Sequence, residues 1–329
     1  MANPMIEVRH LKKYFNTPKG TLHAVDDISF RIEKGKTMGV VGESGCGKST
    51  LGRTIIHLLE STDGQIFLDG KDITHVDKHQ MHEINERMQI VFQDPYSSLN
   101  PRQTVEDVIR EPLKLSKRYK TRAEIDAKTD ELMKLVGIDE RLRHAYPHEL
   151  DGGRRQRVGI ARALSLNPDF IVCDEPVSAL DVSIQAQVLN LLQDLQEKQG
   201  LTYMFVTHDL SVVRHISDDI CVMYLGQLVE KAPTRELFAH TLHPYTKALL
   251  SAIPIPSLHN KKERVLLKGE LSSPINPKDQ CRFAGRCDYC TEECLKKPTP
   301  ELTEITPGHF VACHRVREIQ QIPGNQKAE

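Results

Sequence analysis

Residues 38–49 read MGVVGESGCGKS, and the last eight of them match the pattern G-x-x-x-x-G-K-[ST]. An apolar run that we predict to be a strand, Met38 to Val41, precedes this loop, and the helix-prone run TLGRTIIHLL begins at Thr50. A strand, this loop and a helix, in that order, are typical of a phosphate-binding P-loop. We therefore predict that residues 42–49 bind the phosphates of a nucleotide.

The residue types in this loop suit that chemistry. Glycines allow the backbone N–H groups to wrap around phosphates. Lys48 supplies a point charge for the β- and γ-phosphates, and Ser49 offers a hydroxyl to Mg²⁺. The helix expected to begin at Gly47 or Lys48 adds positive potential at its N-terminus. The predicted ATP-binding residues of this segment are Gly42, Glu43, Ser44, Gly45, Cys46, Gly47, Lys48, Ser49 and Thr50.

A second motif completes the predicted nucleotide site. Residues 170–175, FIVCDE, form an apolar strand that ends in two carboxylates. In such an arrangement Asp174 would hold the Mg²⁺ shell, and Glu175 would orient or deprotonate the attacking water. A carboxylate at the end of a strand is also commonly a helix cap. The position of this pair after the P-loop and before PVSALD favours the catalytic interpretation.

The pattern of strands and helices predicts an α/β fold with a largely parallel core sheet. Strands are expected within residues 6–70 and at 170–174, 203–207 and 219–230. Residues 94–165 are charged and helical in period, which indicates a helical subdomain inserted into the α/β domain. We predict a nucleotide-binding domain over 1–232 and a small, loop-rich, cysteine-rich C-terminal module over 233–329.

Composition excludes several classes of protein. The 329 residues carry a formal net charge of −1, which gives no support to a wholesale basic nucleic-acid binder, although a local basic patch is compatible with this charge. The longest apolar run, residues 220–225, is far shorter than the roughly 20 residues that cross a bilayer. The N-terminus lacks the apolar stretch of a signal peptide. We expect a cytosolic protein that reaches a membrane only through a protein partner.

These motifs, with three more, occur in the order found in one family. Over residues 6–230 the chain resembles the ATP-binding cassette (ABC) subunits of transporters, which have a P-loop NTPase fold with a helical subdomain. The additional matching pieces are VFQDP with Gln93, LDGGR at 150–154 and VTHD with His208. The resemblance implies that Glu175, Gln93 and His208 are catalytic, with His208 as the sensor of the γ-phosphate.

The same resemblance implies that two ABC subunits sandwich two ATP molecules. The signature residues that would face the partner's ATP are Asp151, Gly152, Gly153 and Arg154, and the D-loop includes Ser178 and Asp181. Phe15 stands where the family has an aromatic residue that stacks on adenine, and Tyr14 is the alternative. Either ring could instead belong to the core.

The C-terminal third narrows the family further. HPYTKALLSAIP at 243–254, GELSSPINP at 269–277 and CRFAGRC at 281–287 resemble the ATPases of oligopeptide and dipeptide importers. The resemblance implies ATP and Mg²⁺ as cofactors and a place on the cytoplasmic face of the membrane. It also implies a second ABC ATPase subunit, two transmembrane permease subunits and an extracytoplasmic peptide-binding protein as partners.

Three alternatives remain open from the sequence. Relatives of this type also import nickel, glutathione or other solutes. A soluble ABC protein of translation or DNA repair would usually carry two cassettes or a long insertion, and this chain has neither. An iron–sulfur redox protein with an incidental nucleotide site is opposed by the complete set of cassette motifs.

Five of the eight cysteines lie between Cys281 and Cys313, and in a reducing cytosol such a group favours metal ligation over disulfides. Four thiolates suffice for a [4Fe–4S] cluster or a Zn²⁺ site. Resemblance to dipeptide-importer ATPases that carry an iron–sulfur cluster implies the ligands Cys281, Cys287, Cys294 and Cys313, with Cys290 as the spare. A zinc site would instead use Cys287 and Cys290 as a knuckle, and small buried thiols without metal are the third possibility.

The signature region departs from the family's usual LSGGQ, because Asp151 replaces the serine and Arg154 the glutamine. An ionised Asp151 offers no hydroxyl donor and places a negative charge near the partner's γ-phosphate. A like-charge contact near 4 Å costs about 4 kcal/mol at an effective dielectric of 20. That exceeds the roughly 1 kcal/mol of a lost neutral hydrogen bond, although Arg154 can offset part of it. Since Ser and Asp both cap helices well, a tolerated substitution is the alternative to our prediction, a heterodimer with unequal ATP sites.

Overall fold

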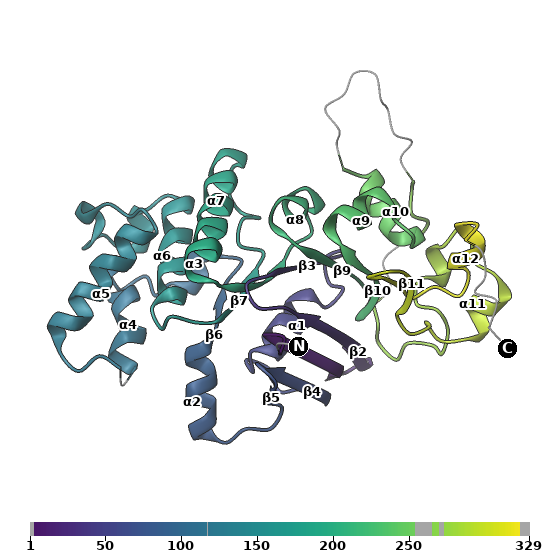
Figure 1. Ribbon diagram of the computed structural model, residues 1–329, viewed down its shortest axis with the longest axis horizontal. Helices are drawn as coiled ribbons and strands as arrows, with labels where there is room; N and C mark the ends of the chain where they lie inside the picture. The colour runs from purple at the N-terminus through teal and green to yellow at the C-terminus, as the bar shows by residue number, and fades with distance from the viewer. Residues whose placement is uncertain (1–2, 117, 254–264, 270–272, 323–329) are drawn as a thin grey trace.

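The structure is a computed structural model that describes residues 3–116, 118–253, 265–269 and 273–322. Two sheets occupy the centre of the molecule, with a helical block on one side and the C-terminal region on the other (Figure 1). Pro254 and residues 270–272 of the quoted C-terminal stretches lie outside the described residues. Within those residues, no helix combines the length and the apolar character needed to cross a membrane.

The larger sheet has eight strands and carries the nucleotide motifs. Its spatial order is β11 (Thr303–Thr306), β12 (His309–Val311), β10 (Gln227–Pro233), β9 (Asp219–Tyr224), β3 (Thr37–Val41), β8 (Thr202–Val206), β7 (Phe170–Asp174) and β6 (Met88–Val91). The strands from β9 to β6 run parallel, and β10, β12 and β11 extend the sheet antiparallel. Every residue of β3, β7 and β8 is buried, as expected for parallel strands covered on both faces. The predicted parallel core is therefore confirmed.

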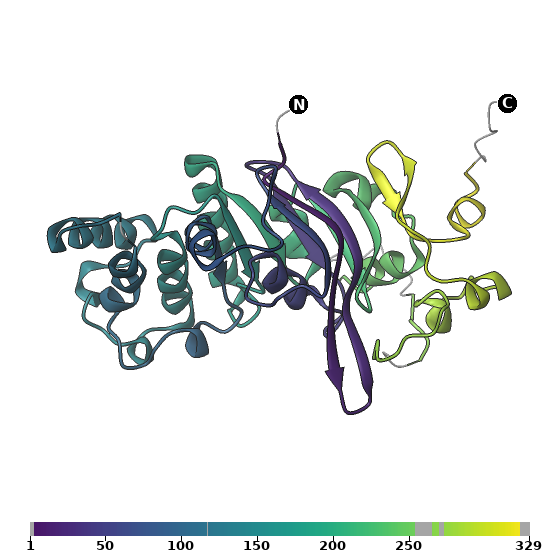
Figure 2. The ribbon, with the colours of Figure 1, turned by 90° about the horizontal axis from the view of Figure 1, so that it is seen from below.

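A second, antiparallel sheet packs over the P-loop helix. Its order is β2 (Gly20–Ile32), β1 (Ile6–Thr17), β4 (Asp63–Leu68) and β5 (Lys71–Asp72). Helix α1 (Lys48–Ile55) buries Leu51 and Ile55 in one cluster with Ile6 of β1 and Val172 of β7. The helix that begins at the P-loop is thus fixed between the two sheets. The end of the β1–β2 hairpin projects from the body of the molecule (Figure 2).

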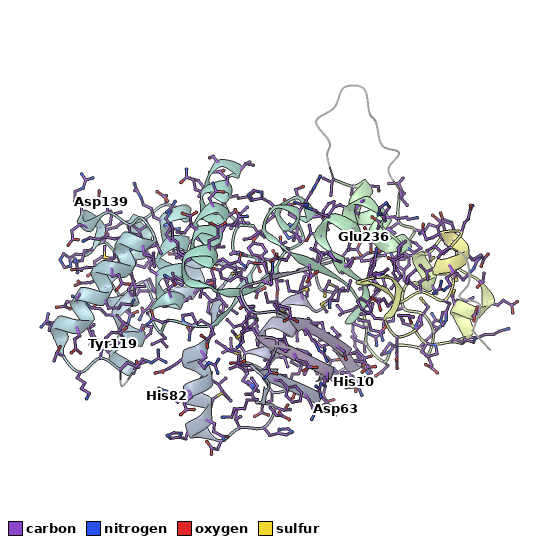
Figure 3. The ribbon with its side chains drawn as sticks, viewed as in Figure 1. His10, Asp63, His82, Tyr119, Asp139 and Glu236 are labelled. Atoms are coloured by element: carbon purple, nitrogen blue, oxygen red, sulfur yellow. The ribbon has the colours of Figure 1, made fainter. Side chains whose placement is uncertain are left out.

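Helices make up most of residues 94–165, as predicted. They are α3 (Pro95–Ser98), α4 (Val105–Leu115), α5 (Arg122–Leu135), the 3-10 turns η1 (Glu140–Leu142) and η2 (Pro147–Glu149), and α6 (Gly152–Leu164). Capping boxes define the starts of α4 and α5, at Thr104 and Thr121. In Figure 3, Tyr119 and Asp139 lie on this block, whereas His10 and Asp63 lie on the antiparallel sheet. The remaining helices before residue 220 are α2 (Lys78–Arg87), α7 (Val182–Gln199) and α8 (Leu210–Ile216).

The chain after residue 232 continues the main sheet. Its elements besides β11 and β12 are α9 (Thr234–Ala239), α10 (Pro244–Ser251), η3 (Ala284–Arg286), α11 (Glu292–Lys296) and α12 (Val316–Ile319). Strand β12 pairs with β10, where Glu230 lies opposite Val311. The buried carboxylate of Glu230 lies 2.7 Å from Nε2 of the buried His309 and accepts the backbone N–H of Leu242 at 2.7 Å. The domain boundary near residue 232 stays a prediction, and a strand ladder and a buried polar network cross it.

Candidate active site

The P-loop joins β3 to α1 in a conformation that only glycine allows at two positions. Gly42 has φ 154° and Gly47 has φ 106°. A Cβ at Gly42 would lie 2.2 Å from the carbonyl oxygen of Met223, and one at Gly47 would lie 2.0 Å from that of Ala24. The loop can therefore lie close against β9 and β2 only because these residues lack a side chain.

Lys48 is held inside this loop. Its side chain is almost completely buried, and Nζ donates to the carbonyl oxygens of Gly42 at 2.8 Å and Glu43 at 3.0 Å. An ammonium group has three donors, so this arrangement fixes the charge at the mouth of the loop. Cys46 is also buried and its Sγ lies 3.9 Å from Nζ, while burial raises the pKa of its thiol.

Ser49 and Asp174 place two oxygen ligands side by side. The Ser49 hydroxyl donates to Oδ1 of the buried Asp174 at 2.6 Å. Hydroxyl and carboxylate oxygens are ligands that Mg²⁺ prefers, so the Ser49 and Asp174 oxygens fit the predicted metal. Arg53, one turn after Ser49 on α1, donates to Oδ2 of Asp174 at 3.1 Å. The sequence analysis missed Arg53, although its i, i+4 spacing from Ser49 put it on the same helix face.

The three residues predicted to be catalytic meet at one carboxylate oxygen. Gln93 Nε2 donates to Oε2 of Glu175 at 3.1 Å, and His208 Nδ1 lies 3.2 Å from the same oxygen. Glu175 itself has φ 48°, a left-handed conformation that is unusual for a side-chain-bearing residue. This left-handed backbone lies directly after β7, and residues from two separate segments, Gln93 and His208, hold the carboxylate.

A cavity of about 650 Å³ lies between these groups. Its lining includes Lys48, Gln93, Glu175, His208 and Phe15. The remaining lining residues are Leu22, Ala24, Gly42, Glu43, Ser44, Gly45, Gly47, Ser49, Thr50, Leu249 and Pro274.

Of the two candidate adenine-stacking aromatics, Phe15 faces this cavity. The ring of Tyr14 instead stacks on His23 at a centroid distance of 4.0 Å, and its hydroxyl donates to Asp26. Burial, followed by the hydrogen bond to Asp26, raises the pKa of Tyr14 above its usual range. The geometry therefore favours Phe15 over Tyr14 as the aromatic at the nucleotide site.

The signature residues are absent from the lining of this cavity. Asp151 is the N-cap of α6, where Oδ1 accepts the backbone N–H of Arg154 at 2.8 Å. Arg154 Nε also lies 3.5 Å from Oδ2 of Asp151. Gly152 packs toward Leu180, just before α7, and Gly153 packs toward Ile184 in the first turn of α7.

The two D-loop residues link Glu175 to helix α7. The Ser178 hydroxyl donates to the carbonyl oxygen of Glu175 at 3.1 Å, and Asp181 is the N-cap of α7. Ser178 and Asp181, like the signature residues, are absent from the lining of the cavity that contains the P-loop.

The C-terminal region contributes four contacts that the sequence analysis missed. Leu249 of α10 and Pro274 line the cavity. Tyr245 of α10 accepts the backbone N–H of Glu43 at 2.9 Å, and Arg286 of η3 forms an ion pair with the Glu43 side chain. Each lies about 200 or more residues from the P-loop, so no local pattern in the sequence points to it.

The fold places several of the cysteines of this region close to one another. Burial, with the neighbouring thiols as a further cause, raises the pKa of both Cys281 and Cys287 to about 11. Cys294 and Cys313 are among those neighbours, and the N–H of Cys281 donates to the carbonyl oxygen of Cys294 at 2.9 Å. In the described parts of the chain, however, no three Cys, His, Asp or Glu side chains are grouped as ligands of a metal ion.

The fold and the cavity define an ATPase of the ATP-binding cassette class, and the family described as "ABC transporter" matches residues 25–178. The family described as "Oligopeptide/dipeptide transporter, C-terminal region" matches residues 229–294. The chain belongs to the family of oligopeptide transport ATP-binding proteins, as its similarity to curated relatives shows.

Two of these relatives come from Bacillus subtilis. The oligopeptide transport ATP-binding protein AppF is 50% identical over 320 residues, which are 94% of this chain and 97% of that protein. OppF, described in the same words, is 50% identical over 314 residues, which are 95% and 97% of the two chains. The similarity thus includes the C-terminal region as well as the cassette.

Solved cassettes share the fold of about 70% of the chain. CbiO1 from Clostridium perfringens, part of the ABC transporter complex cbiONQ, has a TM-score of 0.64 and 30% identity, covering 72% of this chain and 92% of that one. The ATP-binding cassette MJ0796, in a dimeric post-hydrolysis state bound to ADP and Pi, has a TM-score of 0.65 and 29% identity, covering 70% and 99%.

Proposed function

We propose that this chain is the ATP-hydrolysing subunit of an importer for dipeptides or oligopeptides. The observation that carries the proposal is the meeting of Gln93 and His208 at the Glu175 carboxylate, on the wall of the cavity that also contains Lys48. Such a carboxylate serves water activation, and the lysine serves phosphate binding. The peptide substrate is inferred from the names of the relatives.

The proposed mechanism assigns one task to each group. The P-loop amides and Lys48 bind and orient the phosphates, and Phe15 stacks on the base. Ser49 and Asp174 would hold Mg²⁺, which would supply positive charge against the charge that develops on the phosphates. Glu175 accepts a hydrogen bond or a proton from the attacking water, while Gln93 and His208 hold its carboxylate in position.

Hydrolysis in this proposal needs a second cassette. Because the signature and the P-loop lie apart in one chain, each ATP site joins the P-loop of one subunit to the signature of the other. A heterodimer with a second ABC ATPase, docked on two permease subunits at the cytoplasmic face of the membrane, would convert ATP-driven closure into permease movement. The peptide would arrive on an extracytoplasmic binding protein.

Transport assays test this function directly. The chain, its partner ATPase, the permeases and the binding protein would be reconstituted in proteoliposomes, and uptake of labelled di- and oligopeptides would be measured. We expect uptake that requires ATP and all subunits. ATP-dependent uptake of nickel or glutathione in place of peptides would change the substrate, and failure of the chain to co-purify with permeases would contradict a transport role.

Lys48→Ala is expected to weaken ATP binding itself. The lost ammonium contributes a charge-assisted hydrogen bond of about 1.5–3 kcal/mol, which corresponds to roughly tenfold to hundredfold in affinity. Equilibrium binding of a fluorescent ATP analogue measures this change. Lys198→Ala removes the same charge from the exposed face of α7 and should bind ATP like the unmodified chain. Unchanged affinity in Lys48→Ala would contradict the assigned role of the P-loop.

For the cysteine group we propose a [4Fe–4S] cluster on Cys281, Cys287, Cys294 and Cys313, with a structural role. The support is chemical, because four thiolates are the ligand set of such a cluster. The thiols also lie close enough for their charges to affect one another, as the raised pKa values of Cys281 and Cys287 indicate. A short, loop-rich segment with a small hydrophobic core also gains folding stability from such a cross-link. A Zn²⁺ site that includes Cys287 and Cys290 is the alternative.

Metal analysis distinguishes the proposed [4Fe–4S] cluster from the alternative Zn²⁺ site. Protein purified without oxygen is expected to be brown and to contain about four iron atoms per chain. Cys287→Ser and Cys294→Ser should each lose the colour, and Cys290→Ser, the matched control, should keep it. Colourless protein with stoichiometric zinc would assign the site to zinc, and protein free of both metals would contradict metal binding.

A further inference from the structure

The second residue of the P-loop, Glu43, is held on both its side chain and its backbone by the C-terminal region. Arg286 donates to the two carboxylate oxygens of Glu43 at 2.6 and 3.0 Å. The hydroxyl oxygen of Tyr245 accepts the backbone N–H of Glu43 at 2.9 Å. The two contacts come from different parts of the C-terminal region, η3 and α10, and converge on one residue of the ATP cavity.

Both contacts are well shielded from water. The side chain of Arg286 is 11% exposed and that of Glu43 is 26% exposed, and paired N–H···O bonds between guanidinium and carboxylate fix both partners in orientation. Tyr245 is fully buried, and its ring lies edge-on to Tyr224 at 4.7 Å and near Phe283 at 5.5 Å. The Tyr245 contact therefore lies in the packed core, and the Arg286–Glu43 ion pair is partly buried. We call these two contacts on Glu43 the brace.

The position of Glu43 connects the brace to phosphate binding. The carbonyl oxygen of Glu43 accepts from Lys48 Nζ at 3.0 Å, so the same residue that the C-terminal region holds also holds the P-loop lysine. Release of Glu43 would free one of the two carbonyl groups that position this ammonium. Preorganised backbone and charge at a phosphate site lower the cost of binding.

We propose that Arg286 and Tyr245 are positioning residues of the ATP site, which act through Glu43 to hold the P-loop in the conformation that binds phosphate. This inference rests on the proposed ATP-binding role of residues 42–49. On this proposal the C-terminal region is a part of the nucleotide site. Arg286 directly precedes Cys287 in the sequence, so a structural change in the cysteine group could move Arg286 and, through it, Glu43.

Variants of the assembled transporter test the brace. We expect Arg286→Ala to raise the KM for ATP and weaken binding of a fluorescent ATP analogue by about fivefold, at the low end of typical coupling between sites, with little change in kcat. Arg286→Lys keeps the charge but not the paired hydrogen bonds and should recover only part of the affinity. Tyr245→Phe, which leaves the ring in place, should weaken ATP binding in the same sense.

A double-mutant cycle shows whether Arg286 acts through Glu43. Glu43→Ala combined with Arg286→Ala should lose no more affinity than either change alone, because both remove one interaction. Arg141→Ala is the matched control: it breaks an exposed arginine–carboxylate pair with Asp139 in the helical subdomain and should leave ATP affinity unchanged. Additive losses in the cycle, or an equal loss in Arg141→Ala, would overturn the proposal.

A measurement on the unmodified complex does not depend on the folding of a variant. Because coupling is reciprocal, ATP should slow amide hydrogen exchange at residues 281–287 as well as in the P-loop. Protection of the P-loop without protection of 281–287 would refute the brace and leave ATP binding intact. Absence of ATP binding to the unmodified complex would refute the proposed function, and the brace with it.

Discussion

Glu175→Gln is expected to leave ATP binding intact and to slow ATP hydrolysis by about a hundredfold to ten-thousandfold, the usual contribution of a general base. The amide keeps the size of the side chain but cannot accept a proton from the attacking water. Gln93 at 3.1 Å and His208 at 3.2 Å would still hold the side chain, so the shape of the site should survive. The variant should therefore accumulate as an ATP-bound, closed dimer.

Phosphate release by the assembled transporter measures the rate, and size-exclusion chromatography with ATP and Mg²⁺ detects the closed dimer. Glu197→Gln makes the same chemical change on the exposed face of α7 and should hydrolyse ATP at the normal rate. The contrast with Lys48→Ala is informative, because that change should reduce binding and prevent dimer formation. Hydrolysis at a comparable rate in Glu175→Gln would refute the role assigned to this carboxylate.

The second prediction with a large expected effect is that the two ATP sites of the proposed heterodimer hydrolyse ATP at unequal rates. Asp151 stands at the signature position that normally offers a hydroxyl to the partner's γ-phosphate, and its side chain is 58% exposed. The carboxylate caps α6 and lies 3.5 Å from Arg154 Nε, so both the helix cap and the partial charge compensation expected from the sequence are present in the fold. The remaining negative charge should slow turnover at the site that this signature completes.

Separate substitution of Glu175 and of the equivalent glutamate in the partner ATPase reveals this asymmetry. Glu175→Gln should abolish nearly all hydrolysis, since the site built on this chain's Lys48, Glu175 and His208 is completed by the partner's signature. The equivalent change in the partner should cause only a slight loss. Equal losses would refute the asymmetry and leave the transporter assignment standing.

Asp151→Ser sharpens the test, because serine keeps the helix cap and restores the hydroxyl. In the Glu175→Gln background, where only the slow site can work, this substitution should raise ATP hydrolysis above the level of Glu175→Gln alone. No increase would show that the carboxylate is not what limits the second site. Asp194→Ser, an exposed change on α7, controls for the loss of charge.

The catalytic motifs could be predicted because their chemistry is local. Continuous apolar runs placed β3 and β7, and the glycines after β3 together with Lys48 defined the P-loop within eight residues. The strand predicted at 203–207 lies one residue earlier, at 202–206, since hydrogen bonding to β3 and β7 and not composition sets its ends. Strand β6 was not predicted, because four residues at the edge of the sheet carry too weak a pattern.

Other features depend on contacts between distant segments. The sequence alone could not choose between Tyr14 and Phe15, which are neighbours of similar type, whereas the fold turns Tyr14 toward His23 and Asp26 and leaves Phe15 on the cavity. The grouping of Gln93 and His208 at Glu175 was implied by family resemblance, and only the fold supplies the distances.

The sequence by itself thus determined the fold class, the loop that would bind phosphate and the carboxylate pair, since each depends on residues a few positions apart. The tertiary structure decided that β12 joins β10 and that Arg286 and Tyr245 reach Glu43. An ion pair between residues 243 positions apart leaves no periodic pattern in either segment. Its partners are chosen by the packing of the C-terminal region against the sheet, which only the folded chain brings about.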